Sequence, residues 1–301
     1  MKTELKMTSQ SWLLLILLSM LWGGSFFFIE LALRDLPTLT IVFLRVAIAA
    51  IFLNIYLLVN AKKMPRDAKT WLSFFVLGLL NNFIPFSLIV WGQVYIEGGL
   101  ASILNATTPI FAVILAHFLL KDEPMTANKV FGVVLGLVGV VVLIGLEPLR
   151  GMSQNIWAQL AVVGAGISYA FAGIYGRRFK DIEAIFTATG MLTSTAIMIL
   201  PVALIIDKPW HLNPSFLTVL AVLGLALLST VAAYLIYFHI LSVAGATNVL
   251  LVTMLIPVSA VLLSGIFLGE RLHWTAFLGM ALIISALLTI DARLFYQFNK
   301  N

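Results

Sequence analysis

The chain has 301 residues, of which 61% are hydrophobic and only 10% charged, and its formal net charge is +5. Soluble domains carry roughly a quarter of their residues as charges, so this composition excludes a soluble globular protein. The basic residues are spread over short segments between apolar runs, which excludes a nucleic-acid-binding patch as the reason for the net charge.

The apolar runs are about 20 residues long and do not alternate every second residue, so they predict transmembrane helices rather than barrel strands. They lie near residues 11–30, 38–60, 70–93, 97–120, 128–146, 155–176, 184–206, 215–242, 245–268 and 274–292. The first run is longer than the apolar core of a usual signal peptide and lacks a small-residue cleavage site, so we expect a retained helix. The sequence thus predicts an all-α polytopic membrane protein with ten transmembrane helices.

The distribution of basic residues predicts the orientation, because Lys and Arg accumulate in cytoplasmic segments of membrane proteins. With ten helices and a cytoplasmic N-terminus, the cytoplasmic side holds Lys2, Lys6, Lys62, Lys63, Arg66, Lys69, Lys121, Lys129, Arg177, Arg178, Lys180, Arg293 and Lys300. The opposite side holds only Arg34, Arg150, Lys208 and Arg271. We therefore expect a multi-pass protein of the cytoplasmic (inner) membrane with both termini in the cytoplasm.

The sequence contains a weak internal repeat, which divides the chain into residues 1–150 and 151–301. At an offset of 147 or 148 residues, the fourth and fifth segments match the ninth and tenth through the pairs Pro109 and Pro257, Glu123 and Glu270, and Gly132 and Gly279. A repeat of five helices has odd parity, so the second copy enters the membrane from the other side. Two inverted five-helix repeats around a central cavity are an architecture of alternating-access transporters.

Several blocks resemble the EamA family of the drug/metabolite transporter superfamily: LWGGSF in the first segment, FLR in the second, NATTPIFAVILAHFLLKDE in the fourth and IPVSAVLLSGIFLGERL in the ninth. The resemblance covers nearly the whole chain. It implies ten helices, a central cavity, and transport, often export, of amino acids or related metabolites. One departure is that Pro109 lies fourteen residues before Glu123, whereas Pro257 lies thirteen residues before Glu270.

Three prolines inside the apolar segments predict a substrate site near the middle of the membrane. Proline has no N–H to donate, so it frees the carbonyl four residues earlier. At Pro85, Pro109 and Pro257 these carbonyls belong to Asn81, Asn105 and Thr253. Each lies roughly 7 to 11 residues into its helix, which approaches the middle of a hydrocarbon core about 30 Å thick. Unsatisfied polar groups are costly in lipid, so we expect these groups to face a wet cavity.

The repeat places Ser229 and Thr230 opposite Asn81 and Asn82, and aromatic side chains complete the predicted walls. The predicted substrate-binding residues are Trp22, Asn81, Asn82, Asn105, Tyr169, Ser229, Thr230, Tyr234 and Thr253. Phe26, Phe86, Trp91, Tyr175 and Tyr237 are further aromatic candidates. The alternative is that the Asn and Thr side chains only hold neighbouring helices together.

Arg45 is the basic residue inside a predicted helix, and burying it unpaired would be costly. Glu30, at the outer end of the first predicted helix, lies on the same side, so we expect an ion pair between them at the outer mouth. The pair is interpreted either as an outer gate, with Arg45 meeting a substrate carboxylate when the gate opens, or as a static structural contact.

Gly132 and Gly136 form a GxxxG motif in the fifth segment. Such glycines let helix backbones approach closely. We expect packing inside the chain, with a homodimer contact through the fifth and tenth helices as the alternative.

The sequence contains no HExxH or GxSxG motif and no cysteine, so it offers no catalytic residues, no metal site and no cofactor motif. We expect a secondary transporter of small organic solutes, with export following from the family resemblance. A facilitator or an importer of metabolites would have the same sequence features, and a non-transporting scaffold or receptor is the remaining alternative.

Overall fold

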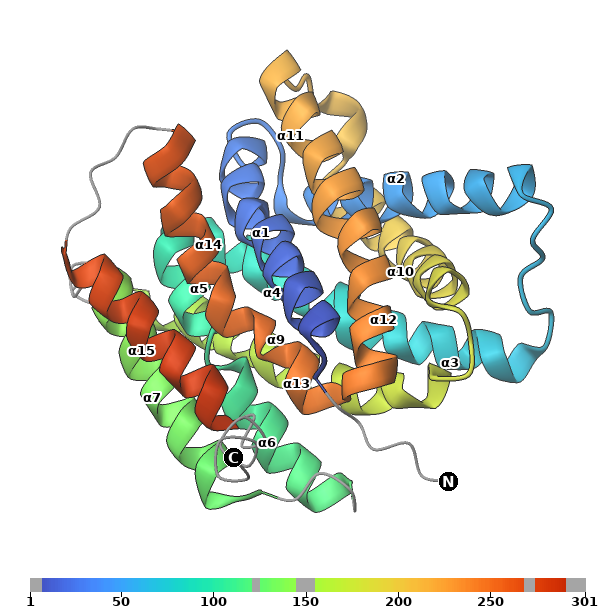
Figure 1. Ribbon diagram of the computed structural model, residues 1–301. Coiled ribbons are helices and arrows are strands. Elements are labelled where there is room, and N and C mark those ends of the chain that lie inside the picture. The colour runs from blue at the N-terminus through green and yellow to red at the C-terminus, as the bar shows by residue number, and fades with distance from the viewer. Residues whose placement is uncertain (1–6, 121–124, 145–154, 268–273, 291–301) are drawn as a thin grey trace.

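The computed structural model describes residues 7–120, 125–144, 155–267 and 274–290, and over these residues it consists of helices and turns (Figure 1). The helices of the first half are α1 (Ser9–Ala32), α2 (Thr38–Val59), α3 (Ala68–Gly78), α4 (Ile84–Gln93), α5 (Gly98–Asn105), α6 (Thr108–Leu119) and α7 (Ala127–Ile144). Those of the second half are α9 (Ile156–Gly176), α10 (Ala184–Ile206), α11 (Phe216–Ala226), α12 (Ala233–Ala244), α13 (Ala246–Leu250), α14 (Val252–Phe267) and α15 (Trp274–Ile290).

Among the described residues, seven helical stretches are long and apolar enough to cross a membrane. They are Ser9–Ala32, Thr38–Val59, Ala68–Gln93, Gly98–Leu119, Ile156–Phe179, Ala184–Ile206 and Phe216–Ala244. Three shorter apolar helices cover Ala127–Leu143, Asn248–Ser259 and Phe277–Ile290. The all-helical, polytopic class predicted from the sequence is therefore confirmed.

The predicted fourth and ninth helices are each interrupted. Between α5 and α6 the chain turns at Ala106, and the carbonyl of Asn105, which Pro109 leaves free, accepts a hydrogen bond from the Thr108 hydroxyl at 2.6 Å. Between α13 and α14 the interruption lies at Leu251, well before the proline of the ninth segment. Both interruptions are short turns inside the predicted segments, and Gly98–Leu119 still forms one stretch long and apolar enough to cross a membrane.

A glycine separates α12 from α13, where the sequence has almost no charge. Gly245 has φ 89°, a left-handed conformation that side chains other than glycine rarely adopt. It ends α12 and lets the chain reverse directly into α13. The predicted turn at this residue is confirmed.

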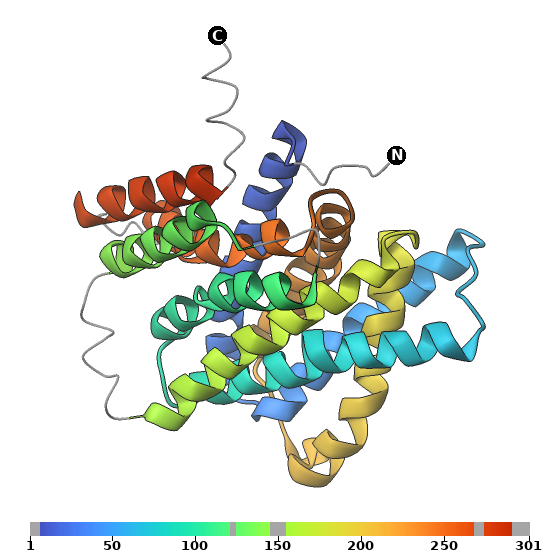
Figure 2. The same ribbon diagram turned by 90° about the horizontal axis from the view of Figure 1, so that it is seen from below.

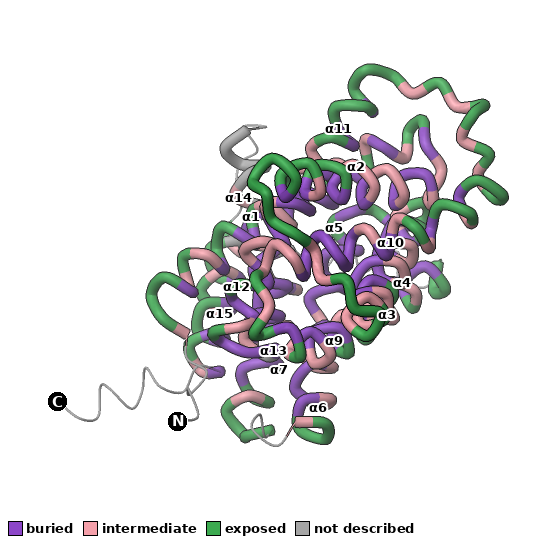
Figure 3. Tube along the Cα trace, turned by 90° about the vertical axis from the view of Figure 1, so that its right-hand side faces the viewer, coloured by how far each residue is buried: buried purple, intermediate pink, exposed green. Residues whose placement is uncertain are grey.

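The helix α1 lies in the middle of the bundle, where it packs against α5, α11, α12 and α14 (Figure 1). On one side of it α9 packs against α4, α5 and α6, and on another α10 packs against α2, α3 and α12. Figure 3 shows that the buried stretches gather in the middle of the molecule while exposed stretches follow its outer helices and loops. The polar site described below lies within this buried interior.

Side-chain carboxylates join loops of the two halves at the end of the molecule where α1 meets α2. Asp35 accepts hydrogen bonds from the Ser215 backbone N–H at 2.9 Å, and from the hydroxyls of Ser215 and Thr218 at 2.6 Å each. These donors lower the pKa of Asp35 to about 2. Beside them Asp207 accepts from the backbone N–H of Thr40 at 2.6 Å and caps the start of α2.

The helices α7 and α15 pack side by side along their length, as both ribbon views show (Figures 1 and 2). A Cβ atom on Gly132 would lie 2.9 Å from the carbonyl oxygen of Ala286, and one on Gly279 would lie 2.4 Å from the backbone nitrogen of Leu143. The glycine motif is thus occupied by a helix of the same chain, in agreement with the expected internal packing. A homodimer through these helices would have to use their outer faces.

We predict that Gly279→Ala lowers the stability of the protein by about 1–3 kcal/mol, because the added methyl group must push the backbone of α7 away. Unfolding followed by intrinsic fluorescence in lipid nanodiscs measures the change. Gly99→Ala is the matched control, since a Cβ there meets nothing within 4 Å. A change from dimer to monomer with unchanged stability would contradict the internal role of the glycine.

Candidate functional site

Two π-helical turns carry polar residues into the core. One covers Leu79–Phe83 between α3 and α4, and the other covers Leu227–Ala232 between α11 and α12. Their first residues lie 148 positions apart, which is the offset of the sequence repeat. A π-turn widens the helix by one residue, and such turns are rare and frequent at functional sites. The first contains Asn81 and Asn82, and the second contains Ser229 and Thr230, all of them buried.

Side-chain hydroxyls form hydrogen bonds with backbone carbonyls in these turns and in the helices next to them. The Thr230 hydroxyl donates to the carbonyl of Leu225 at 2.8 Å, five residues earlier in the same helix. Across the bundle, Ser168 of α9 donates to the carbonyl of Leu80 at 2.6 Å. The hydroxyl of Ser229 donates to the carbonyl of Leu21 in α1 at 2.6 Å. The π-turns are therefore tied to their neighbours by hydrogen bonds rather than by apolar packing alone.

Tyr234 joins the two halves at the first π-turn. Its hydroxyl is 3.2 Å from the carbonyl oxygen of Asn81, and it makes a short hydrogen bond to Oδ1 of Asn82. The residue four positions after Asn81 is Pro85, which has no N–H to donate. The amide nitrogen of Asn82 in turn donates to the Thr195 hydroxyl of α10 at 3.1 Å. This chain of hydrogen bonds holds the first π-turn, α10 and α12 together.

The second π-turn holds Arg45, whose side chain is only 4% exposed. Its Nε donates to the Thr230 hydroxyl at 2.8 Å and its Nη2 donates to the carbonyl of Ser229 at 3.1 Å. The centre of the guanidinium group lies 3.7 Å from the centroid of the Phe86 ring, a cation–π contact. Neutral groups thus surround a full positive charge.

The predicted ion pair between Arg45 and Glu30 is wrong. Within the part of the chain that the structure describes, Arg45 has no carboxylate partner, and Glu30 is exposed at the end of α1. The error arises because Arg45 extends from α2 toward α12 and α4, whereas Glu30 faces outward. The acidic residues Glu123 and Glu270 lie outside the described residues.

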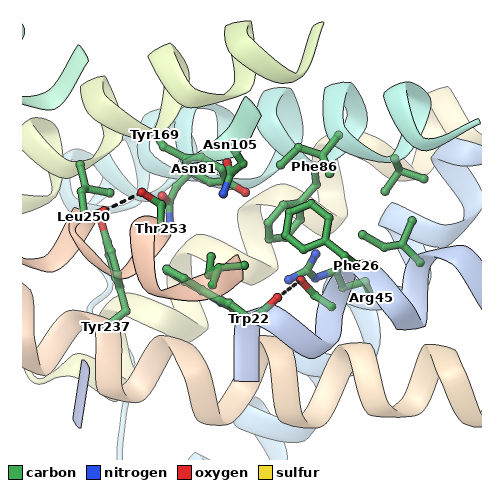
Figure 4. A pocket seen from close by; sticks show the side chains of 15 residues that line it. Trp22, Phe26, Arg45, Asn81, Phe86, Asn105, Tyr169, Tyr237, Leu250 and Thr253 are labelled. Carbon is green, nitrogen blue, oxygen red and sulfur yellow. Dashed lines mark hydrogen bonds between the residues drawn. The ribbon is translucent and has the colours of Figure 1, made fainter. Parts of the chain in front are cut away.

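A cavity lies beside the first π-turn, and residues of α1, α2, α4, α5, α9, α12, α13 and α14 also line it (Figure 4). Of the residues predicted to bind substrate, Trp22, Asn81, Asn105, Tyr169 and Thr253 line it, and so does Arg45. These residues come from α1, α2, α5, α9, α14 and the first π-turn, so both halves of the chain contribute.

The other four predicted residues do not line the cavity and lie behind the residues that do. Asn82, Ser229, Thr230 and Tyr234 are fully or almost fully buried, and they position Arg45, Asn81 and α1 through the hydrogen bonds described above. Among the further aromatic candidates, Phe26, Phe86 and Tyr237 line the cavity. Trp91 is 38% exposed and contacts Tyr95, and Tyr175 packs under Arg178 on the outside.

The remaining lining residues were not predicted. They are Ser25, Ile29, Ile89, Val90, Leu250 and Ile256. Five of them are aliphatic and indistinguishable in sequence from residues that face lipid. Ser25 lies one helical turn after Trp22, and this spacing was the one signal that could have revealed it.

Two polar atoms on the cavity wall have no hydrogen-bond partner among the described residues. They are Oδ1 of Asn105 and the hydroxyl of Tyr237, and both are shielded from the outside. Buried polar atoms are seldom left unpaired, so such atoms on the wall of a cavity are sites where a ligand or water can bind. Figure 4 shows Tyr237 at one end of the cavity and Arg45 well away from it, beside Phe26 and Phe86.

Seven helical stretches long and apolar enough to cross a membrane, among the described residues, define a multi-pass membrane protein, and its bundle encloses the cavity. The model of the EamA-like transporter family matches residues 10–145 and 156–290. The chain therefore belongs to the EamA-like transporter family, and its role is that of a membrane transporter rather than an enzyme.

Relatives of similar length support this assignment. The chain is 27% identical over 270 residues to the uncharacterized transporter YoaV of Bacillus subtilis, covering 89% of this chain and 92% of that protein. It is 26% identical over 281 residues to the uncharacterized inner membrane transporter YedA of Escherichia coli, covering 92% and 89%. A solved crystal structure with 18% identity shares the fold, with a TM-score of 0.76 over 94% of this chain and 97% of that one.

We predict that Tyr234→Phe destabilises the protein by about 1–2 kcal/mol, because the buried oxygens of Asn81 and Asn82 lose their shared donor. Equilibrium unfolding in mixed micelles measures the loss. Tyr56→Phe, on an exposed part of α2, serves as the control and should leave stability unchanged. Equal stability of the two variants would mean that the Tyr234 hydroxyl does not hold the halves together.

Proposed function

We propose that this protein is a secondary transporter that moves small organic solutes, amino acids or related metabolites, by alternating access through the central cavity. The observation that carries the proposal is a cavity walled by helices of both halves, with a buried charge, unpaired polar atoms and aromatic rings inside an otherwise apolar bundle. A cavity between two halves can open to either side when the halves rock against each other. Export is the proposed direction, on the resemblance to the family.

The proposed architecture is ten membrane crossings in two inverted repeats, residues 1–150 and 151–301. Its support is that the family model matches the chain twice, and that the two π-turns recur at the offset of the sequence repeat. The starts of α5 and α13, at Gly98 and Ala246, follow the same offset. With five helices in each repeat, the second copy is inverted, so the cavity wall combines two equivalent halves of opposite orientation.

Transport itself is tested by counterflow in proteoliposomes with a panel of labelled amino acids and metabolites. We predict that Asn105→Leu reduces counterflow at least about ten-fold, because it removes a polar group from the cavity wall. The amount of folded protein should stay close to that of the unchanged chain. Asn60→Leu, in an exposed position after α2, is the control. Unchanged flux in Asn105→Leu would contradict the proposed site, and loss of folded protein would assign Asn105 to helix packing.

We further propose that the protein lies in the cytoplasmic membrane with both termini and the loop at residues 61–67 in the cytoplasm. The absence of cysteine makes thiol labelling specific. We predict that Lys63→Cys reacts with a membrane-impermeant maleimide only after spheroplasts are permeabilised. Asn213→Cys, in the exposed connection before α11, should react in intact spheroplasts. The reverse pattern would show that the orientation is inverted.

A further inference from the structure

Arg45 holds a positive charge in the cavity wall that the described residues do not neutralise. Arginine keeps its proton in proteins, and it carries five N–H donors in a planar fork. Two of the five are used, by the Thr230 hydroxyl and the carbonyl of Ser229. The other three have no acceptor among the described residues. Burying a charge is costly, so an anion or water that accepts from the remaining donors would stabilise this guanidinium further.

The guanidinium is held rigidly rather than being free to turn. The two hydrogen bonds fix one edge of its plane, and the Phe86 ring covers one face at 3.7 Å. The edge formed by the two terminal nitrogens is the one left for a further ligand. That edge binds a carboxylate through two parallel hydrogen bonds, an arrangement in which arginine is much better than lysine.

We propose that Arg45 is the subsite that binds the carboxylate of the transported solute. This inference rests on the proposed transport function. Among the cavity-lining residues Arg45 is the one with a charged side chain, so a single negative charge balances the site, whereas a doubly charged phosphate would leave a net negative charge buried.

The other end of the cavity defines the second feature of the solute. Oδ1 of Asn105 is an acceptor, and the Tyr237 hydroxyl can accept or donate, and neither has a partner among the described residues. Apolar side chains, among them Ile89, Val90 and Ile256, line the same cavity. The complementary solute is a monocarboxylate with an apolar body and an ammonium or hydroxyl group that donates a hydrogen bond.

The test compares three probes of one shape: L-leucine, L-leucinamide, which lacks the carboxylate, and 4-methylpentanoate, which lacks the ammonium. Binding to the purified full chain is measured by ligand-induced thermal stabilisation in nanodiscs, and transport by counterflow in proteoliposomes. We expect the unchanged chain to bind L-leucine at least about ten-fold more tightly than L-leucinamide, as a charge-assisted pair predicts. It should prefer L-leucine to 4-methylpentanoate as well.

Substitutions at Arg45 and Asn105 test which residue is responsible for each ligand preference. Arg45→Gln should bind L-leucine and L-leucinamide equally, and Arg45→Lys should keep a weakened preference because the charge remains without the fork. Asn105→Leu should lose the preference for L-leucine over 4-methylpentanoate and keep the carboxylate preference. Arg178→Gln is the matched control, since Arg178 also lies on an aromatic ring, 3.8 Å from Tyr175, but on the exposed surface.

The possible outcomes test the transport function and the carboxylate subsite separately. Carboxylate-dependent binding without any flux would reject transport and keep the subsite. Flux in which Arg45→Gln or Arg45→Lys retains the full preference for L-leucine over L-leucinamide would reject the subsite and make Arg45 structural. Absence of both binding and flux for all three probes would reject the proposed class of solute.

Discussion

The structure depends on one constraint, which is that the hydrocarbon core of a bilayer supplies no hydrogen bonds. Every backbone N–H and carbonyl there must find a partner in the protein, and an uninterrupted helix is the simplest solution. The chain departs from that solution inside the bundle, at the two π-turns and between α5 and α6. At each departure a side-chain hydroxyl donates to a backbone carbonyl, as Tyr234 does to Asn81, Thr108 to Asn105 and Thr230 to Leu225. Functional groups thus gather where the helices are irregular.

The same constraint explains why polar residues on the π-turns divide into two layers. Those that face the cavity, such as Asn81, are exposed to whatever enters it. The others, Asn82, Ser229 and Thr230, are fully buried and hold their neighbours. The buried layer keeps the cavity-facing side chains in place through its hydrogen bonds, which is how a binding site can be rigid without filling its own cavity.

Much of the fold could be predicted from the sequence, because long apolar runs and their charged or glycine-containing ends follow directly from the thickness of a membrane. The cavity residues beside prolines, Asn81, Asn105 and Thr253, were also found, since a proline marks where a helix loses a donor. The partner of Arg45 was missed because sequence proximity to Glu30 says nothing about which neighbouring helix a long side chain reaches. The π-turns were missed for a similar reason, because their stabilising partners, among them Ser168 and Leu21, come from distant segments.

The carboxylate of Asp35, at the junction of the two halves, is not suited to carrying protons. A group that carries protons across a membrane must gain and lose them near the pH on either side of it. With three donors holding its pKa at about 2, Asp35 stays ionised through the whole physiological pH range. It therefore acts as a permanent anion at this end of the molecule, and a proton motive force could not act through it.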